Sequence, residues 1–363
     1  MDTWRDTRRP LWPLALLVPL LPFIALAVAA ATGSGWAWWL TPAVVFGVIP
    51  AIDLLIGDDR VNPPEELVPA LQASPYYRWI TYLYLPAQYG ALLVGCRVWS
   101  GGVDPVTAAG LVLTIGVVNG IAINTAHELG HKRASVERRL SKIALAPTGY
   151  GHFFVEHNRG HHVRVATPED PASARLGESF WRFWPRTVLG SLRSAWRLEA
   201  SRLRLRGRHP WTPRNAVLNA WSLTVVLAAV LVAVFGPGVL PFLAAQAVVG
   251  FTLLEVVNYL EHYGLRRQRT ATGRYEAVDP RHSWNSDRLV TNVFLFQLQR
   301  HSDHHANPLR RYQVLRTFDV SPQLPAGYAT MVVVALVPPL WRRIMDHRVV
   351  AHYGGDPALA NTG

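Results

Sequence analysis

The sequence predicts an all-α membrane protein with six transmembrane helices, and two observations support this prediction. Half of the 363 residues are apolar, and the apolar residues gather in long runs separated by charged stretches. Each of six runs is close to the roughly 20 residues that a helix needs to cross about 30 Å of hydrocarbon. Six such runs rarely occur together in a soluble protein, so a soluble fold with buried helices is the poorer interpretation.

The six expected spans follow one another in three pairs. They are Leu11–Ala31, Trp36–Ile56, Ile80–Val98, Val106–Ala126, Ala216–Phe235 and Val239–Tyr259. The turns inside the pairs (33–35, 100–105 and 236–238) contain no Lys or Arg, whereas the segment 132–214 is rich in both. Cytosolic loops of membrane proteins carry the excess of Lys and Arg. We therefore expect a multi-pass protein of the plasma membrane, packed as three hairpins, with both termini in the cytosol.

The net charge of +12 does not indicate a nucleic-acid partner, because the basic residues are distributed as membrane topology requires. The single cysteine, Cys96, excludes an internal disulfide and an iron–sulfur or cysteine-ligated zinc site of the chain's own. Any bound metal must therefore be held by histidine and carboxylate side chains.

Nine of the 14 histidines fall into four short motifs on the expected cytosolic side. These nine are His127, His131, His157, His161, His162, His262, His301, His304 and His305. Helix residues three or four apart share a face. We therefore expect a common direction within each of three sets: His127 with His131, His157 with His161, and His301 with His304 and His305. Two further histidines, His152 and His282, lie near the motifs, and we expect them to stay outside the ligand set.

Imidazole is a good ligand for Fe, Zn, Cu and Ni, and one such ion takes about four to six ligands. Nine converging imidazoles are too many for one ion and suit two. The sequence thus predicts a cytosolic, helical, histidine-rich di-metal site. The cytosolic segments 127–215 and 260–363 would carry it, and with the spans they would form a single membrane-embedded catalytic domain over residues 1–363.

Carboxylates beside metal-ligating histidines can accept the free imidazole N–H and fix the tautomer of the ring. Glu128, Glu156, Glu261 and Asp303 flank the motifs, and each could reach a histidine of another motif. Asp53 lies inside the second expected span, where an ionisable side chain is costly and therefore a functional candidate. We expect Asp53 to accept a hydrogen bond from a ligand histidine, with simple solvation as the alternative.

At these residues the chain resembles a known family. The stretches His127–Lys132, Glu156–His162, Asn258–Gly264 and Leu298–Ala306 resemble the signature boxes of the integral-membrane alkane 1-monooxygenases. These enzymes belong to a wider superfamily of histidine-rich membrane hydroxylases and desaturases. The resemblance covers roughly residues 40–350, and the nine histidines match without a departure.

This resemblance implies two non-haem iron ions and the hydroxylation of the terminal methyl of medium- or long-chain n-alkanes to primary alcohols. It also implies O₂ as the oxidant and a rubredoxin, itself reduced by a rubredoxin reductase, as the electron donor. An alkane dissolved in the membrane lipid could enter between the helices, and we expect the second, third, fourth and sixth spans to line its route. Rubredoxins of this family are typically acidic, so Arg310 and Arg311 are candidate docking residues. Binding of anionic lipid or a purely topological role are alternatives for the cytosolic arginines.

Other functions remain as alternatives. A related membrane di-iron hydroxylase or desaturase of fatty-acyl chains or other lipids would use the same histidines. The stretch His127–His131 also matches the H-E-x-x-H motif of zinc metalloproteases, in which Glu128 would be the general base. An intramembrane zinc protease would leave six of the nine histidines without a role.

Overall fold

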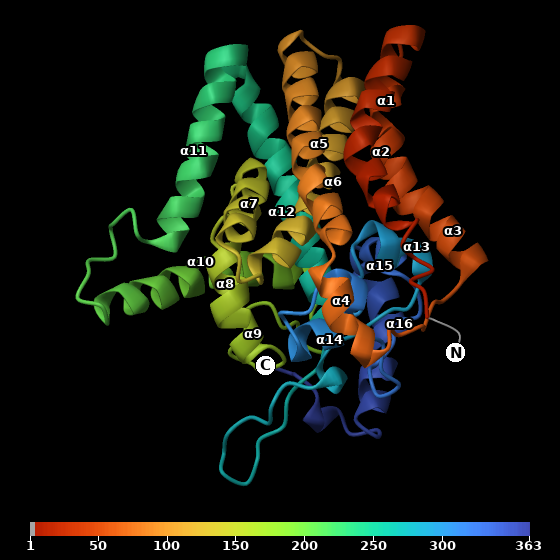
Figure 1. The fold of residues 1–363 in the computed structure, drawn as a ribbon, viewed down its shortest axis with the longest axis vertical. Helices are drawn as coiled ribbons and strands as arrows, with labels where there is room; N and C mark the ends of the chain where they lie inside the picture. The colour runs from red at the N-terminus through yellow and green to blue at the C-terminus, as the bar shows by residue number, and fades with distance from the viewer. Residues whose placement is uncertain (1–3) are drawn as a thin grey trace.

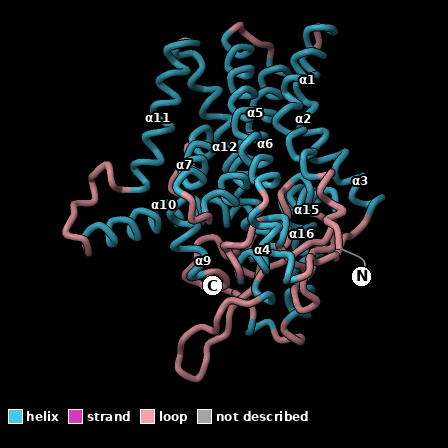
Figure 2. Tube along the Cα trace, viewed as in Figure 1, coloured by secondary structure: helices cyan, strands magenta, loops and turns pink. Residues whose placement is uncertain are grey.

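The computed structural model describes residues 4–363, and over that range it contains helices and loops but no named β-strand. Long helices stand side by side in the upper part of the molecule, and short helices and loops gather below them (Figures 1 and 2). The long helices are α1 (Leu17–Thr32), α5 (Pro75–Ser100), α6 (Pro105–Gly130), α11 (Ala216–Phe235) and α12 (Leu240–His262). The expected all-α fold is thereby confirmed.

Within residues 4–363, five helical stretches are long and apolar enough to cross a membrane. They are Trp12–Thr32, Gly35–Ile56, Pro105–Gly130, Ala216–Phe235 and Pro237–His262, and they cover five of the six expected spans. The second stretch is composite, because a π-helical turn at Val44–Val48 joins α2 (Leu40–Ala43) to α3 (Ile49–Ile56).

The remaining expected span, Ile80–Val98, forms most of α5, which is long enough to cross but less apolar. Polar residues of α5 have partners inside the bundle. Gln88 is buried and donates to Asn119 of α6 at 2.9 Å, and Asn119 donates to Gln246 of α12 at 2.7 Å. Side-chain hydrogen bonds of this kind hold helices together in an apolar environment. A sixth span therefore stays a prediction, although α5 is an integral part of the bundle.

Local sequence explains where the long helices begin and turn. Asp104 accepts hydrogen bonds from the backbone N–H groups of Val106 and Thr107 and so caps α6. Asn215 caps α11 in the same way through Val217 and Leu218. At the end of α1, Gly33 adopts a left-handed conformation that suits glycine, and the chain reverses there.

The short helices support the lower end of the bundle. They are α4 (Val68–Ala73), α7 (Ser135–Leu145), α8 (Phe153–Glu156), α9 (His162–Arg164), α13 (Leu289–Phe294), α14 (His301–Ala306), α15 (Tyr328–Ala335) and α16 (Pro338–His352). The longer α10 (Phe180–Arg204) extends sideways from the bundle in Figure 1. Side chains on its inner face, including Phe183, Thr187 and Ser191, are buried.

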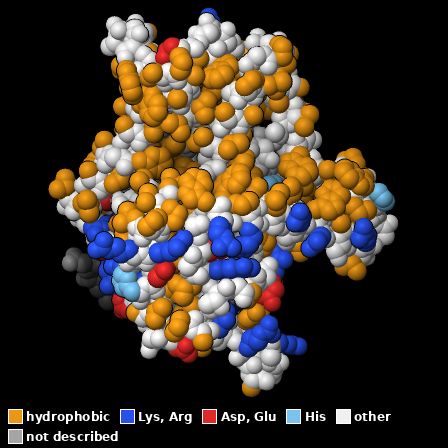
Figure 3. Space-filling view, turned by 180° about the vertical axis from the view of Figure 1, so that it is seen from behind, with side chains coloured by type: hydrophobic (Ala, Val, Ile, Leu, Met, Phe, Trp, Pro, Cys, Tyr) orange, Lys and Arg blue, Asp and Glu red, His pale blue; other side chains and the backbone are white. Residues whose placement is uncertain are grey.

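The surface changes character along the long axis of the molecule. Seen from behind, apolar side chains predominate in the upper part, and Lys and Arg side chains gather in a band across the lower part on this face (Figure 3). Exposed apolar side chains such as Val225, Val234 and Leu93 lie on the upper helices. A large exposed apolar surface of this kind fits a protein embedded in lipid.

Candidate metal centre

The ends of two long helices and two short connecting segments bring all nine predicted histidines together below the bundle. His127 lies in the last turn of α6, and His131 follows directly after that helix. His262 is the last residue of α12. The other six come from the turn that joins α8 to α9 and from α14, namely His157, His161, His162, His301, His304 and His305.

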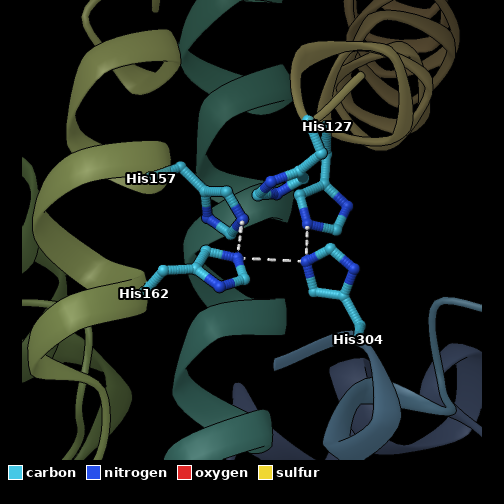
Figure 4. Close-up of side chains that lie close together, drawn as sticks. His127, His157, His162 and His304 are labelled. Carbon is cyan, nitrogen blue, oxygen red and sulfur yellow. Dashed lines mark hydrogen bonds between the residues drawn. The ribbon is translucent and has the colours of Figure 1, made fainter. Parts of the chain in front are cut away.

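The nine histidines form two separate groups, each with ring nitrogens within 4.8 Å of one another. The first group consists of His127, His131, His157, His162 and His304, and the second consists of His161, His262, His301 and His305. In the first, the Nε2 atom of His304 lies 2.8 Å from that of His127 and 3.1 Å from that of His162 (Figure 4). In the second, the Nε2 atom of His301 lies 3.2 Å from that of His262 and 2.9 Å from that of His305.

The expectation that His157 and His161 point the same way is wrong, and the local backbone explains why. Residues 157–161 form a π-helical turn rather than an α-helical one. A π-turn accommodates one more residue per turn, so the neighbour of His157 is His162, with their Nε2 atoms 3.0 Å apart. His161 is thereby directed into the other group. π-turns occur frequently at functional sites.

The three histidines of α14 are also divided between the two groups, although they were expected to share one direction. His301 and His305 are four residues apart and lie together in the second group, whereas His304 belongs to the first. The short helix therefore lies against the boundary between the two groups. Only the pair His127 and His131 keeps its whole motif within one group, as the α-helical spacing predicts.

The outward-facing nitrogens of the second group have carboxylate and hydroxyl neighbours. Nδ1 of His161 lies 2.9 Å from Asp170, Nδ1 of His301 lies 3.2 Å from Glu261, and Nδ1 of His262 lies 3.5 Å from the hydroxyl of Ser283. With Nδ1 of His161 engaged outward, its Nε2 lone pair points into the group, whereas the buried Nδ1 atoms of His301 and His305 make no hydrogen bond in the described chain. The prediction that Glu261 reaches a histidine of another motif agrees with this contact.

Asp170 is a site residue that the sequence analysis did not single out, although it lies in the stretch 166–171 that belongs to the cytosolic loop. Its carboxylate accepts hydrogen bonds from His161 and from the hydroxyl of Ser173 at 2.7 Å. Burial alone would raise the pKa of Asp170, but His161 and these hydrogen bonds outweigh burial and lower the pKa to about 2. The signal available in the sequence was an acidic residue in the loop, eight residues after the clustered His162.

The donor set suits metal ions. Burial, followed by the proximity of the other rings, lowers the pKa well below its usual value for His131, His157, His162, His301, His304 and His305. These imidazoles are therefore neutral near pH 7, as metal ligands must be. The buried Nε2 atoms of His131 and His161 have no hydrogen-bond partner within the chain. Lone pairs that converge at about 3 Å repel each other unless a proton or a cation lies between them.

Three of the four flanking carboxylates do not reach a histidine, which corrects the prediction made for them. Glu128 lies 3.0 Å from Lys132, Glu156 lies 2.6 Å from Arg164, and Asp303 lies 3.0 Å from Arg310. Buried carboxylates need a cationic partner, and these basic side chains supply it from nearby turns. Burial raises the pKa of Glu156 to about 7, although the Ser194 hydroxyl and Arg164 lower it.

The placement of Glu128 also argues against the zinc protease alternative. Its carboxylate is engaged by Lys132 and lies 3.4 Å from the backbone N–H of Tyr312. A protease base would instead have to face water bound beside His127 and His131. Those two histidines belong to a group with three further imidazoles, which a three-ligand zinc site does not require.

The prediction for Asp53 is wrong, because its carboxylate contacts no histidine. It accepts hydrogen bonds from the backbone N–H groups of Val290 and Thr291, at 2.9 and 3.0 Å, and from the Thr291 hydroxyl. Asp53 therefore satisfies free backbone donors in the first turn of α13. This role explains why a buried carboxylate is tolerated near the end of the second expected span.

The structure also alters the prediction that Arg310 and Arg311 form a docking surface. Arg310 pairs with Asp303 at 3.0 Å and Glu65 at 3.2 Å, and Arg311 pairs with Glu137 at 2.8 Å. Their side chains are only 20 % and 14 % exposed. Both arginines are already paired within the chain, so their main contribution is to brace the segment that follows α14.

The two nearby histidines stay outside the two groups, as expected. His152 is buried and packs on Tyr150, with 4.2 Å between the ring centroids, and neither of its ring nitrogens has a partner. His282 accepts a hydrogen bond from the backbone N–H of Asp279 and contacts Glu276 at 3.1 Å.

An apolar cavity extends from the histidines into the bundle. His127, His157 and His301 lie at its lower end, and its walls come from several helices, including Val18, Val45, Ile49, Ile121, Leu253 and Val257. The second, fourth and sixth spans, which were expected to line the substrate route, contribute to this cavity. The third span, expected as well, contributes no residue, and Val18 of α1 lines the cavity instead. Packing accounts for this difference, since α1 and α6 cover the buried face of α5.

Comparison with known proteins gives consistent results. The model of the fatty acid desaturase family matches residues 105–360, a segment that contains all nine histidines. Alkane 1-monooxygenase of Ectopseudomonas oleovorans is 48% identical to the chain over 354 residues, which cover 97% of the chain and 88% of the relative. Alkane 1-monooxygenase of Acinetobacter baylyi is 44% identical over 373 residues, covering 98% and 88%. The hydroxylase component of xylene/toluene monooxygenase from Pseudomonas putida is 26% identical over 317 residues, covering 85% and 81%.

Proposed function

The chain belongs to the alkane 1-monooxygenase family, and we propose that it hydroxylates the terminal methyl group of medium- or long-chain n-alkanes at a di-iron centre. The observation that carries this proposal is an apolar cavity that ends at two groups of clustered histidines. The desaturase-family match and the alkane 1-monooxygenase relatives support the same class of oxidoreductase. When bound, two iron ions would supply the activation of O₂ for insertion of one oxygen atom into a C–H bond.

The nine histidines would hold the metal ions, five around one ion and four around the other. Asp170 would fix the orientation of His161 through its Nδ1 atom, and the carboxylate of Glu261 would lie beside Nδ1 of His301. The apolar walls of the cavity would bind an extended alkane by burying its surface, worth about 25 cal/mol per Å². Because His127, His157 and His301 lie at the end of the cavity, the terminal methyl would be the part of the chain presented to the centre.

Two electrons per turnover must come from outside the chain. Its single cysteine is buried and cannot form an iron–sulfur site alone. We assign this role to rubredoxin, reduced by its reductase, on the basis of family membership. Among the nine histidines, only His131 and His162 are partly exposed, so the donor would approach there. Arg133, which is exposed two residues after His131, is the favoured contact in place of Arg310 and Arg311.

The protein would reside in the plasma membrane with the histidines and both termini on the cytosolic side. The band of Lys and Arg across the lower part of the molecule supports this orientation (Figure 3). Substrate would then enter from the bilayer and electrons from the cytosol. The single membrane-embedded domain over residues 1–363 would combine both access routes.

A product assay tests the proposal. The purified protein, supplied with iron, a rubredoxin, its reductase and NAD(P)H, should convert n-alkanes under ¹⁸O₂ into primary alcohols that carry the label. A membrane hydroxylase or desaturase of acyl chains, which the desaturase-family match also favours, would leave alkanes unchanged and modify acyl lipids instead. Unlabelled alcohol or a product formed only from acyl lipid would refute the proposed function.

A further inference from the structure

A second, smaller cavity adjoins the apolar one beside the histidines. Its lining includes Tyr150, Glu156, Ser191, Glu255 and Asn258, together with both His157 and His161. Because His157 belongs to the first group of histidines and His161 to the second, this cavity borders both groups. Phe153, His157 and Asn258 line both cavities and therefore form the wall between them.

Polar groups inside this inner cavity are arranged around a buried carboxylate. Glu255 of α12 accepts hydrogen bonds from the hydroxyl of Tyr150 at 2.6 Å, the hydroxyl of Thr187 at 2.8 Å and the amide of Asn258 at 3.1 Å. Glu255 is 1 % exposed. A carboxylate buried this deeply in a helix bundle is costly and is usually retained for function.

One polar atom of the inner cavity has no partner within the chain. Glu156 is 3 % exposed, and its Oε2 atom makes no hydrogen bond, whereas its Oε1 atom is held by Arg164 at 2.6 Å. An unpartnered carboxylate oxygen beside Ser191 and Glu255 provides the two to four polar neighbours that a buried water molecule requires. The cavity is therefore suited to water rather than to an alkane.

An outer cavity at the surface lies next to the inner one. Arg164, Pro171, Gly190 and Ser194 line the outer cavity, whereas their chain neighbours Ala172 and Ser191 line the inner cavity. Arg164 stands between the two, because its guanidinium donates to Glu156 on the inner side and to Ser194 on the outer side, each at 2.6 Å. Its side chain is 30 % exposed and is therefore accessible from the solvent.

We propose that these two cavities form a passage for protons and water between the cytosol and the metal centre, with Glu255 as the proton-carrying group at its inner end. The inference rests on the proposed function. Hydroxylation of RH by O₂ takes up two electrons and two protons and releases ROH and one H₂O. Protons would enter past Arg164 and reach Glu255 through water held by Ser191 and Glu156, and product water would leave the same way. The apolar cavity is then reserved for the substrate.

Accessibility of the passage can be measured without turnover. The native chain has a single cysteine, Cys96, which is fully buried. Any labelling of a variant can therefore be assigned to the introduced thiol. Ser191→Cys should react with the small water-soluble reagent 2-aminoethyl methanethiosulfonate, as followed by intact-protein mass spectrometry. Ala195→Cys is the matched control, because Ala195 lies one turn further along α10, is fully buried and packs in an apolar cluster. Equal protection of both thiols in the folded protein would overturn the passage.

The functional test uses two variants that leave the nine histidines untouched. Ser191→Val narrows the inner cavity, and Glu255→Gln keeps its shape but carries no exchangeable acid proton. With donor, alkane and O₂ saturating, each should retain its iron, lower alcohol formation roughly 10-fold or more, and increase the solvent deuterium isotope effect. Leu189→Val, at an exposed position of α10 that lines neither cavity, should behave as the native protein.

The outcomes separate the two proposals. If the native protein forms no alcohol, the proposed function fails, and the labelling result alone decides whether the passage exists. If the native protein is active and Ser191→Val keeps full rate and an unchanged isotope effect, protons reach the centre elsewhere, for example past the partly exposed His131 and His162. That result would overturn the inference even if Glu255→Gln failed to fold.

Discussion

Asp170 shows how one carboxylate can determine the direction of a ligand. It is buried, accepts a hydrogen bond from Nδ1 of His161, and is itself held by Ser173. His161 must therefore present Nε2 to the second group of histidines. Outer partners of this kind typically change metal affinity about 10-fold to 100-fold.

Replacing Asp170 with asparagine should weaken metal binding at the second group and spare the first. An amide can hold Nδ1–H through its oxygen, but it cannot offset positive charge on the ring. We expect metal content after dialysis against a chelator to fall toward half of the native value. Asp53→Asn is the matched control, because Asp53 is equally buried, contacts no histidine, and asparagine also caps helices well. Equal metal loss in both variants would contradict this account.

Among the helices, the contact between α6 and α12 sets the position of His127 and His262. The glycines Gly116 and Gly120 lie one turn apart on α6 and face Gly250 of α12 across a very short distance. Small residues at such spacing let helix backbones approach closely. In lipid the hydrophobic effect does not drive helices together, so their association depends on this close packing. The close approach therefore depends on the absence of side chains at these positions.

Gly116→Ala should destabilise the protein. Its Cβ would lie 2.5 Å from the Cβ of Val249 and 3.0 Å from the backbone oxygen of Gln246, so the two helices would have to separate. Overpacking of this kind costs about 1–3 kcal/mol. Thermal unfolding in detergent should show a lower midpoint. Gly47→Ala is the control, since a Cβ at Gly47 meets nothing within 4 Å, and an equal effect there would argue against tight packing as the cause.

At the scale of the whole molecule, exposed apolar side chains lie on the upper helices, Lys and Arg gather across the lower part on the face in Figure 3, and the histidines lie below the long helices. This arrangement suits the proposed reaction, in which the substrate would come from lipid and the proposed donor, rubredoxin, from the cytosol. Clustered positive charge speeds association with an acidic partner, and salt weakens the effect because screening acts over about 10 Å at 0.1 M. The exposed arginines near His131 and His162 are therefore expected to influence the rate of electron delivery.

At donor concentrations well below saturation, turnover should fall as salt is raised. Arg133→Gln should lower turnover further at low salt while leaving iron content unchanged, because Arg133 is exposed and unpaired with any carboxylate in the described chain. Arg97→Gln is the control, because Arg97 lies in the last turn of α5, at the end of the bundle away from the histidines, and it should leave turnover unchanged. Turnover that is insensitive to salt would favour a role for the arginines in topology or lipid binding.

Much of this arrangement could be predicted from the sequence, because long apolar runs and clustered histidines are strong local signals. Five expected spans and the gathering of nine histidines follow from such patterns. The division into two groups could not be predicted, since a π-turn at 157–161 shifts the register of His161 and His162 by one residue. The pairing of Asp170 with His161 and the capping role of Asp53 depend on tertiary contacts that spacing does not reveal.

Metal analysis combined with turnover is the decisive measurement for the di-iron centre. We predict two iron ions per chain, loss of both iron and alcohol formation on chelation, and recovery of both when ferrous iron is restored. Single variants from each group, His304→Ala and His305→Ala, should each abolish alcohol formation. One zinc ion per chain, or alcohol formation that persists after iron has been removed, would contradict the account.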